Sequence, residues 1–107
     1  MARKRLNSTI LKLIQRYKNS LEKNFPVTEV IVFGSQAKGT AKEWSDIDVC
    51  VVSPILGKDR HDERLMLSRY VDDIDLRIEP HPYHPRDLLD KWDPLAYEIR
   101  KYGIKVV

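Results

Sequence analysis

The 107-residue sequence predicts an α+β fold, a small mixed β-sheet flanked by helices. Three observations predict it: apolar residues at helical spacing in the first 24 residues, short β-branched runs in the middle, and a second helical pattern near the end. With 42% hydrophobic residues, a chain of this length should form one domain. We expect residues 1–107 to comprise an N-terminal helix (1–24), a core that carries the functional site (27–80) and a helical tail (81–107).

The N-terminal segment predicts an amphipathic helix, because its apolar residues recur every three or four positions. Proline disfavours helical geometry in the residue before it, so Asn24 and Pro26 should end this helix. The apolar runs 27–33 and 47–53 then predict two buried strands. The residues of the helical stripe are Leu6, Ile10, Leu13, Ile14, Tyr17 and Leu21.

The second half of the chain predicts three helices and two strands. Helical spacing predicts a surface helix over 58–71, a short helix over 86–90 and a further helix over 94–102. Residues 74–79 alternate apolar and charged side chains, which predicts a half-buried strand with Asp75 and Glu79 on its polar face. The final "IKVV" suits a short strand, and Trp92 and Tyr97 are expected in the core of the tail helices.

Charge and cysteine content limit the possible partners and cellular compartments of the protein. The 19 basic and 16 acidic residues give a net charge of +3, with the basic excess concentrated in the first helix, where solvated helix faces are the simplest explanation. The single Cys50 excludes a disulfide framework and should be a buried thiol in a reducing compartment. No apolar stretch is long enough for a membrane span, so we expect a cytoplasmic protein without a membrane partner.

The stretch "VFGSQAKGT", from Val32 to Thr40, contains the first candidate site. Gly34 and Gly39 have the separation of the P-loop glycines, but Thr40 stands where that motif needs lysine, so it is not a P-loop. Gly34 and Ser35 directly follow a strand, where glycine lets the backbone approach a ligand closely. This turn can hold a phosphate.

A pair of acids supplies the second candidate site. Asp46 and Asp48 lie two positions apart at the start of the second strand, so their side chains point to the same face. Mg²⁺ prefers carboxylate oxygens and completes its shell with substrate phosphates, and two such ions would stabilise an in-line displacement at phosphorus. Such a site usually has a third acid, for which Asp75 is the first candidate and Glu79 the reserve.

Three other side chains are given structural interpretations. His81 and His84 have a spacing that could bind zinc, but no cysteine lies near and prolines interrupt the stretch, which favours a turn. Trp44 could stack on a base, but hydrophobic packing of its loop is the simpler interpretation.

The segment "GSQAKGTAKEWSDIDVCVV" resembles the nucleotidyltransferase signature of the polymerase-β-like superfamily, which is Gly-Ser, ten residues and then Asp-x-Asp. Gly34, Ser35, Asp46 and Asp48 match the signature, and Gly39 matches a glycine usual in its loop. Lys38 replaces the arginine of many members, which keeps the charge but loses the forked contact with phosphate. The short length resembles the minimal nucleotidyltransferases.

This resemblance implies a polymerase-β-like nucleotidyltransferase fold and a transferase activity. Gly34 and Ser35 would hold the β- and γ-phosphates, with Lys38 and Gly39 beside them. Asp46, Asp48 and Asp75 would bind two Mg²⁺ ions, and Asp75 would also help to activate the acceptor. A nucleoside monophosphate, most simply AMP from ATP, would pass to a hydroxyl of a macromolecule while pyrophosphate leaves.

The resemblance also implies a biological setting. Minimal nucleotidyltransferases often accompany small helical proteins of the HEPN type in toxin–antitoxin pairs, and some modify a tyrosine on that partner. We therefore expect an antitoxin enzyme. The alternatives are a binding module that neutralises its partner by contact alone, and nucleic-acid binding through the basic first helix. A chain this small has limited surface for enclosing a nucleotide, so a homo-oligomer could complete the pocket.

Overall fold

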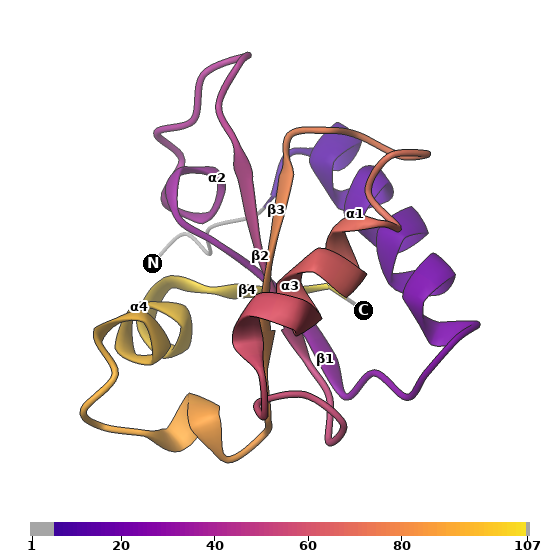
Figure 1. The fold of residues 1–107 in the computed structure, drawn as a ribbon. Coiled ribbons are helices and arrows are strands. Elements are labelled where there is room, and N and C mark those ends of the chain that lie inside the picture. The colour runs from indigo at the N-terminus through magenta and orange to yellow at the C-terminus, as the bar shows by residue number, and fades with distance from the viewer. Residues whose placement is uncertain (1–5, 107) are drawn as a thin grey trace.

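The computed structural model describes residues 6–106, which form a four-stranded sheet with helices on both faces (Figure 1). The strand order is β3-β2-β1-β4, with β2 and β3 parallel and the other pairs antiparallel. The predicted α+β class with a small mixed sheet is confirmed. The elements are α1 (Ser8–Glu22), β1 (Glu29–Phe33), α2 (Ser35–Lys38), β2 (Ile47–Val52), α3 (Arg60–Ser68), β3 (Ile78–Tyr83), the 3-10 turn η1 (Asp87–Leu89), α4 (Pro94–Tyr102) and β4 (Ile104–Val106).

Helix α1 forms as its apolar stripe predicts. The Asn7 side chain caps its start by accepting a hydrogen bond of 2.8 Å from the Thr9 amide. Its buried residues are Ile10, Ile14, Tyr17 and Leu21. The part of the predicted helix in residues 1–5 lies outside the described residues.

The sheet divides the apolar core into two layers because alternate strand residues face opposite sides. On one side, α1 and α3 cover Val30, Val49 and their neighbours. On the other, α4 places Ala96 and Ile99 against residues that include Cys50, whose predicted burial is confirmed. Asp48 belongs to this second face, because it lies two positions before Cys50 on β2.

Tyr17 joins the first of these layers to α3. Its side chain is fully buried, and its hydroxyl donates a 2.8 Å hydrogen bond to the Leu67 carbonyl. Burial raises the pKa of the Tyr17 hydroxyl far above its ordinary value, so the hydroxyl stays protonated and keeps donating.

The third strand differs from its prediction. Residues 71–77 form turns, and the strand spans Ile78–Tyr83 rather than 74–79. The alternation of apolar and charged residues that suggested a strand over 74–79 is instead part of a helix-to-strand connection. The "HPY" stretch, which we expected in a turn, lies in the strand itself.

The strand tolerates Pro80 and Pro82 because of its position and register. β3 is an edge strand, and the Arg77 and Tyr83 carbonyls accept hydrogen bonds from the β2 side. Odd-numbered residues therefore turn their backbone groups toward β2, whereas the prolines occupy even positions whose nitrogens face outward. Proline costs no ladder hydrogen bond at such positions.

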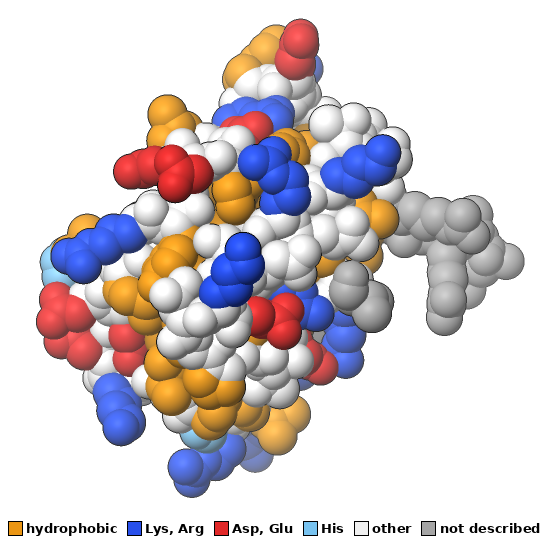
Figure 2. Space-filling model, turned by 90° about the vertical axis from the view of Figure 1, so that its right-hand side faces the viewer, with side chains coloured by type: hydrophobic (Ala, Val, Ile, Leu, Met, Phe, Trp, Pro, Cys, Tyr) orange, Lys and Arg blue, Asp and Glu red, His pale blue; other side chains and the backbone are white. Residues whose placement is uncertain are grey.

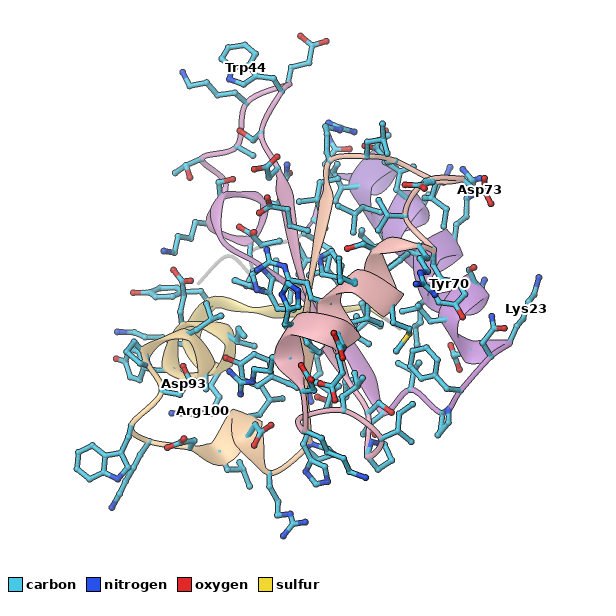
Figure 3. The ribbon with its side chains drawn as sticks, in the orientation of Figure 1. Lys23, Trp44, Tyr70, Asp73, Asp93 and Arg100 are labelled. Carbon is cyan, nitrogen blue, oxygen red and sulfur yellow. The ribbon has the colours of Figure 1, made fainter. Side chains whose placement is uncertain are left out.

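The exposed aromatic side chains overturn three predictions of packing. Trp92, in the turn before α4, is 82% exposed, and Tyr97 is 53% exposed because α4 turns Ala96 and Ile99, not Tyr97, toward the sheet. Trp44 is also exposed, and Figure 3 shows it at the tip of the loop between α2 and β2, away from the rest of the chain. These side chains contribute little to the core.

The surface beside α1 carries mixed charges. Figure 2 shows the Lys and Arg side chains of this face standing apart, with acidic and apolar groups between them. Within residues 6–106, none of the helices combines the length and the apolar character that a bilayer crossing needs.

Candidate active site

The turn after β1 brings the glycine-serine pair against an acid. Gly34 has φ 70° and ψ −149°, a backbone conformation that essentially only glycine adopts. A Cβ atom at this position would overlap Oδ2 of Asp48. The absence of a side chain therefore lets the main chain of the candidate phosphate turn approach the candidate cation ligand.

Three side chains from β2 and β3 converge beside this turn. Asp48 on β2 pairs in register with Glu79 on β3, and His81 follows two positions later on the same face. Each offers one ligand atom, and these atoms all lie within 4.8 Å of one another. Asp46 lies directly before β2, is exposed, and places its charge near Glu79.

The acidic groups of this cluster affect one another's pKa values. Burial, followed by the negative charge of Asp46 and the hydrogen bond and charge of Asp48, raises the pKa of Glu79. The pKa of Asp48 shifts downward, chiefly because the imidazole of His81 faces it. Glu79 therefore holds its proton to a higher pH than Asp48 does.

A divalent cation fits these residues. Carboxylate oxygens and an imidazole nitrogen are close enough to share one ion, and a positive charge would offset the burial and the neighbouring negative charges that raise the pKa of Glu79. The main chain at Gly34 lies against the Asp48 carboxylate. A cation held by the cluster would thus lie beside the candidate phosphate turn.

Asp75 lies in another environment. Because β3 begins at Ile78, the expectation that Asp75 lies on that strand is wrong. Asp75 instead binds the Arg77 guanidinium through two oxygens, at 3.0 and 2.8 Å, and Arg77 donates to the Glu43 carbonyl. The hydrogen bonds of Arg77 lower the pKa of Asp75. This pair ties the loop before Asp46 to the start of β3.

Lys38 and Gly39 end the short helix α2. The Lys38 ammonium forms a 2.6 Å ion pair with Glu98 and lies 5.0 Å from the centre of the Tyr102 ring, so it links α2 to α4. Gly39 caps α2 in the left-handed conformation, and a Cβ atom at this position would meet no atom of the described residues within 4 Å. Contact of either residue with a nucleotide stays a prediction.

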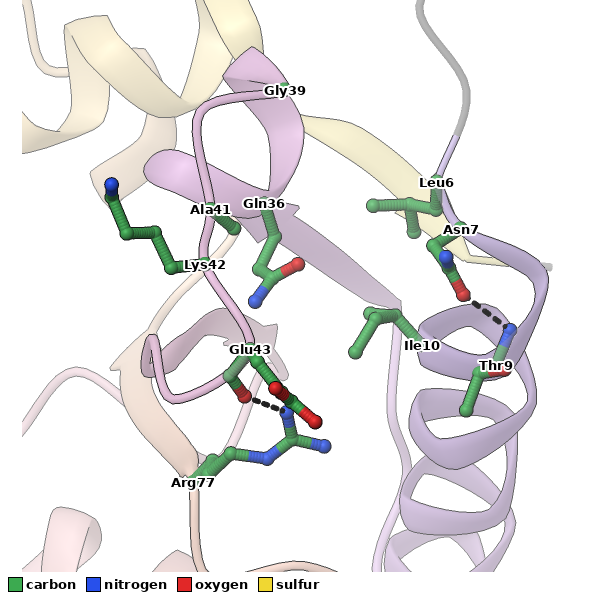
Figure 4. A pocket seen from close by; sticks show the side chains of 10 residues that line it. All are labelled: Leu6, Asn7, Thr9, Ile10, Gln36, Gly39, Ala41, Lys42, Glu43 and Arg77. Carbon is green, nitrogen blue, oxygen red and sulfur yellow. Dashed lines mark hydrogen bonds between the residues drawn. The ribbon is translucent and has the colours of Figure 1, made fainter.

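Two hollows flank these elements. One, of about 270 Å³, opens beside the cluster at β3, where Arg60, His61 and Arg64 of α3 face His81 and Tyr83. The other, of about 750 Å³, lies between the start of α1 and the loop after Gly39 (Figure 4). Arg77 closes the floor of the second hollow, but none of the clustered acids lines it. The smaller hollow is the one next to the candidate chemistry.

The sequence pattern favoured a turn for His81 and made Glu79 the reserve third acid, whereas the structure brings both side chains beside Asp48. Both follow from the position of β3, which the two prolines concealed. The signal was present as a period of two, because Glu79, His81 and Tyr83 alternate with Pro80 and Pro82.

Replacing Glu79 with glutamine should raise the melting temperature of the metal-free protein by a few degrees at most. Because its pKa is raised in the fold above the ordinary 4.5, the wild type loses stability as pH rises from there through the raised pKa. Glutamine cannot ionise and escapes this loss. Melting curves of both proteins in chelator, recorded from acid to neutral pH, should converge at the acid end.

Asp75→Asn is the matched control and should behave in the opposite way. The folded-state pKa of Asp75 is lowered by Arg77, so its charge stabilises the protein above its unfolded pKa, and that contribution is lost as pH falls. The variant should melt slightly lower at neutral pH. If Glu79→Gln also melted lower, repulsion between Glu79 and its acidic neighbours would be contradicted.

Together, a mixed sheet, a glycine-serine turn after β1 and acids at the start of β2 and on β3 define a nucleotidyltransferase of the polymerase-β-like fold. The sequence pattern of the nucleotidyltransferase domain matches residues 14–105, and the chain belongs to this family.

Relatives and solved structures agree with this assignment. The chain is 33% identical, over 112 aligned positions, to a Methanocaldococcus jannaschii protein provisionally named protein adenylyltransferase MJ1305, covering 100% of this chain and 74% of that one. A provisionally assigned nucleotidyltransferase from Sulfolobus solfataricus superposes with a TM-score of 0.67 at 25% identity, covering 91% of this chain and 78% of the other. A toxin–antitoxin crystallised with AMP-PNP has a similar fold, with a TM-score of 0.63 at 20% identity, over 87% of this chain and 71% of that one.

Proposed function

We propose that this nucleotidyltransferase transfers AMP from ATP to a hydroxyl of a partner protein, using Mg²⁺ or a similar divalent ion. The observation that carries the proposal is the convergence of Asp48, Glu79 and the Gly34 turn on one face of the sheet. The similarity to a protein named as a protein adenylyltransferase favours AMP and a protein acceptor.

Each residue has a definite role in this proposal. Asp46, Asp48 and Glu79 hold the cation, with Glu79 in the place that the sequence suggested for Asp75. Gly34 and Ser35 receive the β- and γ-phosphates, because the bare main chain at Gly34 lies against Asp48. When bound, the cation neutralises charge on the phosphates and on the attacking and leaving oxygens.

The order of the strands supports one direction of attack. Gly34 lies on the β1 side of Asp48, whereas His81 and the 270 Å³ hollow lie on its β3 side. In-line transfer needs the acceptor and the leaving pyrophosphate on opposite sides of the α-phosphorus. An acceptor hydroxyl should therefore enter from the hollow, bond to that phosphorus and lose its proton to solvent as pyrophosphate leaves toward Gly34.

We further propose that the acceptor is a tyrosine on a small helical toxin of the HEPN type, so that the enzyme acts as an antitoxin. The fold likeness to a toxin–antitoxin protein supports this setting. The hollow also suits an aromatic acceptor, since Tyr83 and Leu95 line it beside the cationic side chains of α3.

Transfer can be tested with ATP labelled at either end. Incubated with Mg²⁺ and a co-expressed helical partner, the wild type should transfer a label on the α-phosphate of ATP (the α-label) to the partner. A label on the γ-phosphate should not be transferred. Asp48→Asn and Glu79→Gln should lower the rate at least about 100-fold, because each removes a charge that holds the cation. Asp75→Asn should keep most of the rate. Equal rates for wild type and Asp48→Asn would refute the proposed activity.

One observation also favours the alternative of neutralisation by contact alone. Residues 89–97 expose Leu89, Trp92 and Tyr97, large apolar side chains suited to a protein interface. If the Asp48→Asn protein still bound and silenced the partner as well as the wild type does, contact would be sufficient.

A further inference from the structure

The His81 imidazole packs against Phe33 and turns a buried nitrogen toward Asp48. Its Nε2 atom is buried and has no hydrogen-bond partner among the described residues. A buried polar atom without a partner is costly unless something else satisfies it. The carboxylate oxygen Oδ1 of Asp48 lies 3.6 Å away, which is too far for a good hydrogen bond.

The surroundings hold the ring in this orientation. His81 lies between two prolines on β3, and its ring meets that of Phe33 edge to face, with centroids 5.1 Å apart. Phe33 is itself buried at the end of β1. The sheet and the Phe33 ring thus fix the direction in which Nε2 points, unlike that of a flexible side chain on the surface.

The distance suits a shared ion. Two donor atoms that each lie about 2.1 Å from one ion are separated by roughly 3 to 4.2 Å. The 3.6 Å between Nε2 and Oδ1 falls in this range, and Glu79 offers a third donor within 4.8 Å.

We propose that Nε2 of His81 coordinates the divalent cation of this site together with Asp48 and Glu79, and that this nitrogen makes the site prefer Mn²⁺ to Mg²⁺. Mg²⁺ strongly prefers oxygen ligands and gives up water reluctantly. First-row transition ions accept imidazole, so a nitrogen ligand favours them over Mg²⁺. The inference rests on the proposed function only in placing the cation at the same acids.

The test detects coordination of the ion by nitrogen directly, with Mn²⁺ as the probe. Electron spin echo modulation of Mn²⁺ bound to the full chain should show nitrogen coupling, which should change when the histidines carry ¹⁵N. His81→Phe keeps a ring against Phe33 but removes the nitrogen, and should abolish the coupling. His61→Phe, on the exposed surface of α3, is the matched control and should retain it.

Calorimetry supplies the second readout. His81→Phe should weaken Mn²⁺ binding by about 10- to 100-fold while changing Mg²⁺ binding much less. Failure of Mn²⁺ to bind, bound Mn²⁺ without nitrogen coupling in the wild type, or coupling that survives in His81→Phe would each overturn the proposal. The isotope measurement needs only the wild type, so it decides even if the variant folds poorly. AMP transfer without nitrogen coupling would refute this inference alone. Nitrogen coupling without AMP transfer would refute the proposed activity alone.

Discussion

Gly34→Ala should abolish nucleotide transfer, with a loss of at least about 100-fold, because small misplacements of reacting groups cost that much. Two effects act together. Alanine is strained at φ 70° and ψ −149°, at a cost of about 1–3 kcal/mol, and its Cβ would overlap Oδ2 of Asp48. Either the turn or the carboxylate must move, and both belong to the proposed site. The rate of α-label transfer measures the effect.

Gly39→Ala separates backbone strain from damage to the site. Gly39 also has a positive φ, of 79°, but a Cβ there has open space among the described residues. The substitution should lower stability by about 1 kcal/mol and cost far less activity than Gly34→Ala. Thermal melts should accompany both assays. Equal losses of activity in the two variants would show that strain, not contact with Asp48, is responsible.

Tyr17→Ala should destabilise the fold more than any of the other substitutions, costing about 3–5 kcal/mol. The fully buried ring fills the space between α1 and α3, and its removal leaves a cavity in the larger core layer. For a domain of this size, such a loss lowers the melting temperature by more than about 10 °C. Chemical denaturation followed by circular dichroism measures it.

Tyr17→Phe isolates the hydroxyl and should cost only about 1 kcal/mol. The Leu67 carbonyl, which accepts from Tyr17, also accepts from the Tyr70 amide, so it keeps a partner when the hydroxyl is removed. A loss as large as that of Tyr17→Ala would mean that the hydrogen bond, not ring packing, holds α1 against α3.

The elements that the sequence predicts well are those whose periodicity is uninterrupted. β1, β2, α4 and β4 each follow from a single apolar pattern and lie within a few residues of their predicted ranges, and α1 follows its apolar stripe but begins only at Ser8. The predicted strand range in residues 74–83 was wrong because two sequence signals conflicted there. The alternation ending at Ile78 suggested a strand, while Pro80 and Pro82 suggested a turn, and only the edge position of β3 reconciles them.

The candidate site was predictable where it is local in sequence. Gly34, Ser35, Asp46 and Asp48 form one short motif, and the structure brings Gly34 against Asp48. The third acid depends on which residue of a distant strand pairs with Asp48, and that register is a tertiary property. The alternation along β3 places His81 on the face of Glu79, but its position beside Asp48 depends on the register of that strand, and its orientation depends on the Phe33 ring.

The proline-bearing edge of the sheet has a consequence for assembly. Along the outer side of β3, Pro80 and Pro82 have no amide hydrogen, and the Ile78 amide is already bonded to the Asp75 carbonyl. A neighbouring chain therefore finds no backbone donor on the outer side of Ile78–Tyr83, which opposes the addition of a strand at this edge of the sheet. A protein that approaches this side meets side chains and backbone acceptors but no backbone donors.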